Sequence, residues 1–246
     1  MRPLPVLLHV PRSGGTYITA KILQIARQDP HYSNVYYETG NDFHYRFLTD
    51  EAASDKTYLH VIESSGFRGY KEYLSDLYPN QEFKYYMILR NPFDRLYSLY
   101  NYLKSSKSHN EKTHKAISYE TFDDWIINGD GSDFNWIIKS MMSLPTGSKI
   151  EQKHYFKTFH EIKKINVYDM NNIETCIKDI CRTCGFQYLT KTPENPYAKN
   201  DSGVKEKITF DTASEEVQKQ FINKMFWEVT LYANYFSSNR NNFRKI

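Results

Sequence analysis

Short apolar runs, each followed by apolar residues at helical spacing, set the pattern of this chain. The first run, residues 6–10, ends in Pro-Arg-Ser-Gly-Gly, and isoleucines then recur at positions 18, 22 and 25. This pattern predicts a strand, a glycine turn and a helix. Residues 85–89 form the most strand-like run, and Asn91 and Pro92 suit the cap and the first position of a following helix. The sequence therefore predicts two abrupt strand-to-helix connections.

Further strand candidates are residues 57–62 and residues 166–169. Helical patterns separate the candidate strands, and this alternation favours a parallel sheet that is covered on both faces. A length of 246 residues suits one such domain, whereas two full domains would be crowded. The sequence predicts a single α/β domain over residues 1–246, a three-layer sandwich around a central parallel sheet.

The second half of the chain is expected to be mainly helical. A cysteine-bearing amphipathic helix is expected from residue 172, and the last helix is expected to start with a capping box of Thr212 and Glu215. Its inward positions are Val217, Phe221, Met225, Val229, Tyr232 and Phe236. Shorter helices are expected at residues 121–128 and 134–142, and loops at residues 104–115, 141–151 and 190–208.

Charge is nearly balanced, with 32 basic and 29 acidic residues and a net charge of +3. Proteins that track nucleic acid usually carry a clustered basic excess, so no nucleic-acid partner is expected and any anion site must be local. No apolar stretch approaches the length of a membrane span. The first ten residues contain two prolines and a histidine, which does not fit a secretion signal. A soluble, cytoplasmic protein is expected.

Cysteine and histidine patterns do not favour metal chemistry. Cys176, Cys181 and Cys184 cannot all pair with one another, so a disulfide framework is not expected. The last two have the C-x-x-C spacing of a redox pair or half a zinc site, but no second pair exists and structural thiols are expected. Histidines 31, 44, 109, 114, 154 and 160 lack metal-ligand spacing, so no metal is expected. His9 is expected to be structural, because it lies in the first strand.

The first segment that carries chemistry is His-Val-Pro-Arg-Ser-Gly-Gly-Thr-Tyr at positions 9–17. Its two glycines allow a sharp turn and a close approach of the backbone to a ligand. The following helix N-terminus presents free amides and a partial positive charge. Arg12 adds a cation, and Ser13 and Thr16 add hydroxyl donors. The loop predicts a phosphate or sulfate site; an ordinary glycine-containing turn is the alternative.

This loop departs from the P-loop of ATP- and GTP-using enzymes, G-x-x-x-x-G-K followed by Ser or Thr. The Gly-Lys pair is missing. The run at residues 85–89 leads into Arg90, where such enzymes need an aspartate to hold magnesium. A metal-nucleotide enzyme with this sequence would lack that metal ligand.

The second segment is Ile-Leu-Arg-Asn-Pro-Phe-Asp-Arg-Leu-Tyr-Ser at positions 88–98. Arg90 follows a strand at the sheet edge where open α/β folds bind ligands, and Ser98 lies two helical turns further on. A guanidinium and a hydroxyl in these places can clamp one phosphate. In the alternative interpretation, Arg90 pairs with Asp94 and Ser98 is a solvated helix residue.

Together the two segments resemble sulfotransferases that use 3′-phosphoadenosine 5′-phosphosulfate (PAPS). Pro-Arg-Ser-Gly-Gly-Thr-Tyr is similar to their 5′-phosphosulfate loop, and Arg-Asn-Pro-x-x-Arg with Ser eight residues after the first Arg is similar to their 3′-phosphate motif. Order and separation also agree, over about two dozen residues. The chain most resembles carbohydrate O-sulfotransferases of the heparan sulfate 2-O and 6-O kind. Their loop often reads His-x-Pro-Lys-x-Gly-Gly, and Arg12 replaces that Lys, as in many other sulfotransferases.

The resemblance implies the sulfotransferase fold, with a P-loop-like nucleotide site, and metal-free transfer of a sulfuryl group from PAPS to an acceptor. Arg12 and the backbone of residues 13–16 would stabilise the leaving phosphate and the sulfuryl oxygens by preorganised electrostatics. Arg90 and Ser98 would fix the 3′-phosphate, and the product is adenosine 3′,5′-bisphosphate. The residues implied in donor binding are Pro11, Arg12, Ser13, Gly14, Gly15, Thr16, Tyr17, Arg90 and Ser98.

A base for the acceptor proton must come from outside the two segments. His60 lies near the end of the second predicted strand, and related carbohydrate enzymes have a His in a comparable place that takes this proton. His60 and Arg12 are therefore the implied catalytic residues. The alternative is that His60 is a core histidine, and Glu63 is then the reserve base. Arg68 either faces an anionic acceptor or is a turn residue.

The acceptor is expected to be a small molecule or a glycan, and the resemblance to carbohydrate enzymes favours a glycan. Because enzymes of that branch usually carry a Golgi anchor, its absence suggests a bacterial or viral protein or an excised catalytic domain. Two other functions stay open. One is a P-loop kinase of a nucleoside or sugar; the other is a non-catalytic domain that binds a partner through its aromatic surface.

Overall fold

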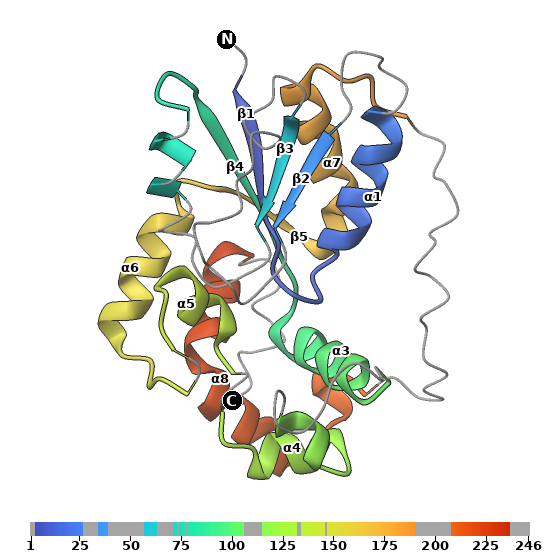
Figure 1. The fold of residues 1–246 in the computed structure, drawn as a ribbon. Helices are drawn as coiled ribbons and strands as arrows, with labels where there is room; N and C mark the ends of the chain where they lie inside the picture. Colours follow the sequence, from blue (N-terminus) through green and yellow to red (C-terminus); the bar gives the residue numbers. More distant parts are fainter. Residues whose placement is uncertain are drawn as a thin grey trace.

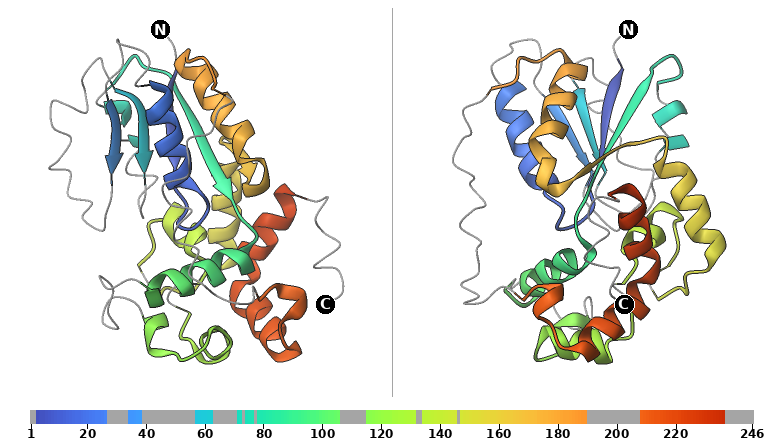
Figure 2. Two further views of the ribbon diagram at one scale, coloured as in Figure 1. Left: turned by 90° about the vertical axis from the view of Figure 1, so that its right-hand side faces the viewer. Right: turned by 180° about the vertical axis from the view of Figure 1, so that it is seen from behind.

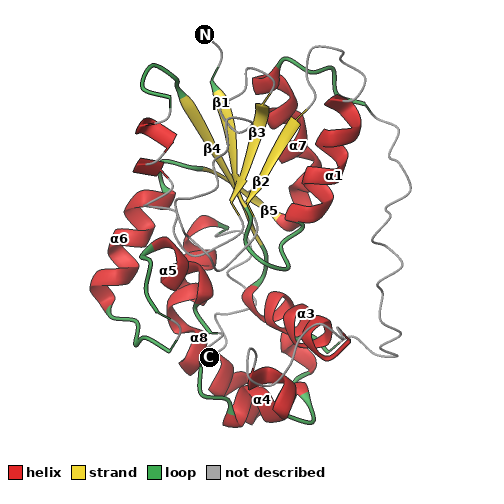
Figure 3. Ribbon diagram, in the orientation of Figure 1, coloured by secondary structure: helices red, strands yellow, loops and turns green. Residues whose placement is uncertain are grey.

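The computed structural model describes residues 3–26, 34–38, 57–62, 71–72, 74–76, 78–105, 115–131, 134–145, 147–189 and 208–236, with only the backbone at 34–38, 57–62 and 115. Strands alternate with helices along the chain (Figure 3). The elements are β1 (Leu4–Leu8), α1 (Gly15–Ala26), β2 (Asn34–Glu38), β3 (Thr57–Ile62), β4 (Phe83–Leu89), α3 (Pro92–Ser105), α4 (Phe122–Asn128), α5 (Trp136–Met141), α6 (Gln152–Ile162), β5 (Asn166–Asp169), α7 (Ile173–Cys184) and α8 (Glu215–Tyr235). Short 3₁₀ turns occur at Lys115–Ser118, Met170–Asn172 and Phe210–Thr212.

The described strands form one parallel sheet in the order β2-β3-β1-β4-β5. At the end of β1, Leu8 pairs with Ile62 of β3 on one side and with Met87 of β4 on the other. After β1 the chain continues to β2 at one edge of the sheet, and after β4 it continues to β5 at the opposite edge. The carboxyl ends of β1 and β4 therefore form the switch point at which open parallel sheets bind ligands. These ends point towards α3 (Figure 1).

The two faces of the sheet pack on different helices. On one face, Leu7 and Ile88 join the buried side chains of α1 and α7. On the other face, Leu8 and Met87 join buried side chains of α5, α6 and α8. Figure 2 shows the two groups of helices on opposite sides of the strands. The structure thus confirms an α/β fold with helices on both faces of a parallel sheet, because alternate residues of each buried strand point to opposite layers.

A third apolar cluster lies beyond the strand ends and holds α3 in place. It is rich in aromatic rings, and Phe93 of α3 packs against three of them, Phe122, Phe210 and Phe221. The Phe93 ring packs edge-on against Phe122 at 5.3 Å and against Phe221 at 5.1 Å between ring centroids. The side chains of Phe93 and Phe221 are fully buried. This packing fixes the N-terminal turn of α3 next to the carboxyl ends of the strands.

The predicted strands at 57–62 and 166–169 are confirmed, and the strand predicted at 85–89 begins two residues earlier. The first strand ends at Leu8 rather than at Val10, because the Val10 carbonyl accepts the Ser13 amide and so belongs to the turn. Two elements, β2 and α6, were not predicted. Helix α6 carries Tyr155, Phe159 and Ile162 at helical spacing and packs them on the core, so the sequence held a signal for this helix that the prediction overlooked.

The prediction of a capping box at Thr212 and Glu215 is wrong. Ser214 caps α8 by accepting the Val217 amide at 3.3 Å. Thr212 instead accepts the Thr209 amide at 3.0 Å and closes a 3₁₀ turn. The predicted inward face is confirmed at Val217, Phe221, Met225, Val229 and Tyr232, whereas Phe236 follows the helix and is half-buried. The helix start was misplaced because hydroxyl residues stand at 209, 212 and 214, and each can cap a turn.

The three cysteines lie in α7, and all three are free thiols buried against α1. Burial raises the pKa of Cys181 to about 11. The expectation of structural thiols agrees with this placement, because a buried thiol with a raised pKa is a poor nucleophile. Among the helices that the structure describes, none combines the length and the apolar character of a membrane span.

Candidate functional site

The connection between β1 and α1, residues 9–14, turns sharply on two left-handed residues. Arg12 has φ 64° and Gly14 has φ 81°. The Ser13 amide donates to the Val10 carbonyl at 3.1 Å and closes the turn between them. Glycine adopts this region freely, but a left-handed arginine is strained, and strain of this kind is concentrated at functional sites.

The first amides of α1 have no hydrogen-bond partner in the described part of the chain. The first backbone bond of this helix runs from the Ile18 amide to the Gly14 carbonyl at 3.1 Å, which leaves the amides of residues 14–17 unused. The Ser13 hydroxyl is also buried without a partner among the described residues. Helix N-terminal amides attract anions, and a buried hydroxyl without a partner is costly. Both features fit an anionic ligand with several oxygen atoms.

Both glycines of this loop sit against other side chains. A Cβ atom at Gly15 would overlap the His9 ring, and one at Gly14 would lie 2.6 Å from Cδ1 of Ile173 in α7. His9 is only 6% exposed. The expected structural role of His9 is therefore consistent with the structure, because its ring fills the space that the missing side chain of Gly15 leaves.

The connection between β4 and α3, residues 90–91, is built differently. Asn91 Oδ1 accepts the amides of Phe93 at 3.0 Å and Asp94 at 3.4 Å. The side chain of Asn91 therefore caps α3, and Pro92 takes the first helical position, as predicted. Because these amides are used, this connection can offer a ligand its side chains and not its backbone.

Arg12, Arg90 and Ser98 meet between the two connections. Arg12 Nε donates to Ser98 Oγ at 3.1 Å, and Arg90 Nη1 donates to the Arg12 carbonyl at 3.0 Å. The Arg12 guanidinium also lies over the ring of Tyr102, 4.7 Å from its centroid. The structure thus brings together the two segments that the sequence singled out. Ser98 is half-buried and accepts a hydrogen bond from Arg12, while Asp94 is the acidic neighbour that acts on Arg90, so both interpretations of this segment stay open.

The two arginines differ in their acidic neighbours, since Asp94 acts on Arg90 and no described carboxylate acts on Arg12. Burial lowers the pKa of Arg12. Burial also lowers the pKa of Arg90; Asp94 opposes this effect, and Arg12 and Arg95 add to it. Within the described ranges, no carboxylate lies at ion-pair distance from Arg12. Arginine stays charged at neutral pH, so an incoming anion would relieve the lost solvation of both groups.

Tyr17, which the resemblance assigns to the donor, contacts α7. Its hydroxyl donates to Glu174 at 2.8 Å, and Lys21 Nζ donates to the same carboxylate at 2.6 Å. Tyr188 also bonds to Glu174. This group ties α1 to the first turn of α7. Sequence reasoning missed it, because residues at positions 17, 21, 174 and 188 show no pattern in the sequence. Thr16 is exposed and Pro11 is half-buried at the edge of the loop.

The proposed acceptor base lies mostly beyond what the structure describes. His60 belongs to β3, where its Cα pairs with Val6 of β1 and with Tyr36 of β2. This register places its backbone two residues before the end of β3, which pairs with the end of β1. The His60 side chain, Glu63 and Arg68 lie outside the described part.

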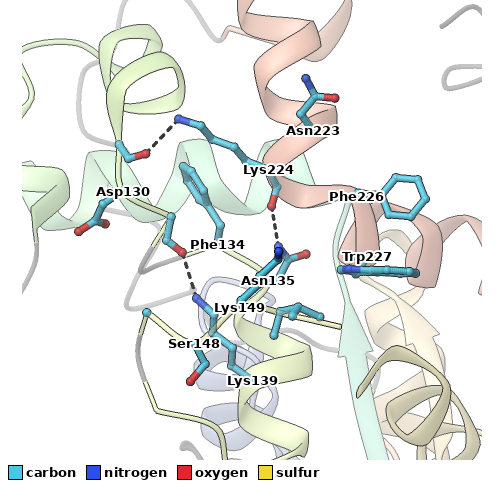
Figure 4. Close-up of a pocket in the computed structure, with 14 residues that line it drawn as sticks. Asp130, Phe134, Asn135, Lys139, Ser148, Lys149, Asn223, Lys224, Phe226 and Trp227 are labelled. Carbon is cyan, nitrogen blue, oxygen red and sulfur yellow. Dashed lines mark hydrogen bonds between the residues drawn. The ribbon is translucent and has the colours of Figure 1, made fainter. Parts of the chain in front are cut away.

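A pocket of about 360 Å³ lies between α5 and α8, away from these groups (Figure 4). Two of its lysines are already used: Lys139 Nζ donates to the Gly131 carbonyl at 3.0 Å, and Lys224 Nζ donates to that of Gly129 at 3.0 Å. Its lining includes neither Arg12 nor Arg90. The junction of the two connections is the candidate site because unused helix amides, a buried hydroxyl and two arginines meet there.

No protein-family model matches this chain, and no curated protein matches it. The candidate site is therefore defined by the geometry of its own residues.

Proposed function

We propose that this chain is a PAPS-dependent sulfotransferase of the sulfotransferase fold, which transfers a sulfuryl group to an acceptor hydroxyl, with a carbohydrate as the expected acceptor. One observation carries the proposal. Two strand-to-helix connections that carry free amides or arginines stand at neighbouring strand ends, and the hydrogen bond from Arg12 to Ser98 joins them. PAPS has a phosphosulfate at its 5′ end and a phosphate at its 3′ end, so its recognition requires two such sites.

The residues present fit the two ends of this donor. The free amides of residues 14–17 and the buried Ser13 hydroxyl suit the oxygen-rich phosphosulfate. Arg90 and Ser98 suit the 3′-phosphate, because a guanidinium and a hydroxyl on one side can share its oxygens. Arg12 belongs to the first connection through its backbone, and its guanidinium bonds to Ser98 in the second, so this residue links the two sites.

In the proposed reaction, the acceptor oxygen bonds to sulfur while the bond from sulfur to the 5′-phosphate oxygen breaks. The acceptor proton passes to His60, and the leaving phosphate takes the negative charge. Arg12 and the amides of α1 stabilise this charge, since preorganised donors aimed at developing charge contribute about 10²- to 10³-fold each. A general base contributes about 10²- to 10⁴-fold.

Ligand-induced thermal stabilisation tests the proposal. The chain should be stabilised by adenosine 3′,5′-bisphosphate in the presence of EDTA, by about 2.7 kcal/mol at a hundred times its dissociation constant. Adenosine 5′-monophosphate, which lacks the 3′-phosphate, should stabilise it less. Stabilisation by ATP with magnesium alone would favour a kinase, and no response to any nucleotide would favour a partner-binding domain.

His60 is tested separately by its alanine variant. His60→Ala should abolish sulfuryl transfer from PAPS, while its affinity for adenosine 3′,5′-bisphosphate stays within about twofold, since a base acts on the acceptor and not on the donor. Glu63→Gln is the matched variant. Normal turnover in His60→Ala together with loss in Glu63→Gln would move the role of base to Glu63.

A further inference from the structure

Arg95 is the second arginine of the Arg-Asn-Pro-x-x-Arg stretch, and donor binding gives it no role. Its side chain is 1% exposed, and so is that of Glu228 on α8. Arg95 Nε donates to Glu228 Oε1 at 2.8 Å, and Nη2 lies at ion-pair distance from the same oxygen without a hydrogen-bond partner among the described residues. Arg95 therefore presents its guanidinium to a buried carboxylate and not to solvent.

On its other side, Glu228 is held by α5 and by Asn135, the residue that precedes α5. Its Oε2 accepts the Ile137 amide at 3.4 Å, and its own amide donates to Asn135 Oδ1 at 3.1 Å. Asn135 Nδ2 donates in turn to the Lys224 carbonyl at 2.6 Å (Figure 4). The carboxylate that receives Arg95 is thus fixed by two helices, α5 and α8, before α3 adds a third.

The Arg95 side of α3 is also the side that reaches the candidate site. Residues three and seven positions apart share a helix face, so Arg95 lies on the face of Ser98 and Tyr102. Those two residues hold the Arg12 guanidinium. Arg95 also lies near Arg90, whose pKa it helps to lower. The buried pair therefore sits directly behind the groups that would receive the 3′-phosphate.

Stability alone does not account for a charged pair at this place. Buried ion pairs are often no more stable than apolar side chains of similar volume, because both charges lose their hydration. What a guanidinium adds is direction, since its fork is planar and rigid and its Nε–H points at Glu228 Oε1. A fixed orientation of α3 is what keeps Ser98 beside Arg12 in this site.

We propose that Arg95 and Glu228 form a positioning pair, through which α8 sets the orientation of α3 and holds Ser98 and Arg90 in place for the 3′-phosphate. The inference rests on the proposed function and deepens it, because it adds α8, which supplies no donor-binding residue, to the machinery of the site. Neither residue touches the donor. They act through Ser98 and Arg90.

The test replaces the pair by apolar side chains of similar length and compares two ligands. Arg95→Met/Glu228→Met should lose at least tenfold in affinity for adenosine 3′,5′-bisphosphate, while its affinity for adenosine 5′-monophosphate changes less than twofold, in calorimetric titrations. Lys84→Met is the matched control. It removes the ion pair with Asp179 at 3.4 Å near the start of β4, and both affinities should stay unchanged.

Equal losses for both ligands, or no loss for either, would overturn the proposal, since the pair would then be only structural. If the double variant does not fold, Arg95→Lys takes its place. A lysine keeps the charge and loses the fork, and a selective loss for the bisphosphate of at least threefold is expected. Unchanged affinity for both nucleotides in a folded Arg95→Lys variant would also overturn it.

A second measurement needs no ligand and separates this inference from the proposed function. The Arg12 Nε proton, observed by nitrogen-15 NMR, should exchange slowly with water in the native chain because it is bound to Ser98. In Arg95→Met/Glu228→Met it should exchange at least tenfold faster, and in Lys84→Met at the native rate. Fast exchange together with no nucleotide binding by the native chain would leave the positioning pair standing and refute the sulfotransferase; native exchange in the double variant would refute the pair.

Discussion

The two strand-to-helix connections of this chain use opposite solutions at neighbouring strand ends. The β1–α1 connection leaves the amides of residues 14–17 without partners in the described structure and folds through two left-handed residues. The β4–α3 connection closes its helix with the Asn91 side chain and shows no left-handed residue. Under the proposed function, one connection offers its backbone to an anion, and the other offers the side chains of Arg90 and Ser98.

From this difference we expect the two connections to tolerate substitution differently. A site made of backbone amides depends on the path of the chain, so glycines and strain matter most there. A site made of side chains depends on where a helix lies, so its packing and its buried ion pair matter most. Arg12 belongs to both, because its backbone forms the first site and its side chain contacts the second.

The largest effect is expected for Arg12→Ala, which removes the group shared by the two connections. Affinity for adenosine 3′,5′-bisphosphate should fall on the order of 100-fold, because the cation that links the two connections and its charge-assisted hydrogen bonds are lost. Isothermal titration measures the affinity. Arg182→Ala is the matched control, since Arg182 is exposed on α7 and pairs only with Asp179 among the described residues. Similar affinities for the two variants would break the comparison, because Arg12 would then not join the sites.

A second substitution tests the backbone character of the first connection. Gly15→Ala should destabilise the fold by about 1–3 kcal/mol, because the added Cβ overlaps the buried His9 ring. Urea denaturation measures the loss. His9→Ala/Gly15→Ala should recover part of it, since the smaller residue vacates the space. A Gly15→Ala variant as stable as the native chain would show that the loop can move away and that its path is not fixed.

The sequence predicted the two connections because each leaves a local signal. Glycines after an apolar run and an Asn-Pro pair before an apolar stripe need only neighbours along the chain to be interpreted. The contact between Arg12 and Ser98 has a separation of 86 residues, and only the pairing of β1 with β4 brings it about. Resemblance to a family assigned these two residues to opposite ends of a donor, and their hydrogen bond could not be predicted from either motif.

The side-chain contacts that the sequence analysis missed lack any such local signal. The pairing of Arg95 with Glu228 spans 133 residues, and a lone glutamate in an amphipathic helix is usually a solvated residue. Nothing local marks Glu228 as buried, because its burial arises only when α3, α5 and α8 pack together. The hydrogen-bond network around Glu174 was also missed, because it joins residues of two helices and the segment after α7 that are far apart in the sequence.

A smaller effect is expected at the cap of the second connection. Asn91→Ala should lower the free energy of unfolding by about 1 kcal/mol, because two amides of α3 lose their acceptor. Asn91→Asp should retain most of the stability. Since the comparison assigns these amides to the cap and not to a ligand, nucleotide affinity should change less than twofold in Asn91→Asp. A gain in stability on removing Asn91 would contradict the cap.

The smallest effect is expected for the hydrogen bonds that tie α1 to Glu174 of α7. These bonds help to hold α1, because no described side chain of the loop caps its first turn. Burial alone would raise the pKa of Glu174, but hydrogen bonds from Lys21, Tyr188 and Tyr17 outweigh it, so the pKa lies below its usual value of 4.5. A lowered pKa in the folded state stabilises the fold above pH 4.5, and this contribution is lost as the pH falls through the lowered value. Glu174→Gln should therefore cost on the order of 0.5 kcal/mol at pH 7, a small figure because the carboxylate is 42% exposed and screened by solvent. The difference from the native chain should shrink at pH 3 in urea denaturation, and it should also shrink in a Lys21→Met background. If the stability difference between Glu174→Gln and the native chain grows on acidification, α1 is oriented by its apolar packing alone. The hydrogen bonds to α7 would then play no part in placing the free amides of the first connection.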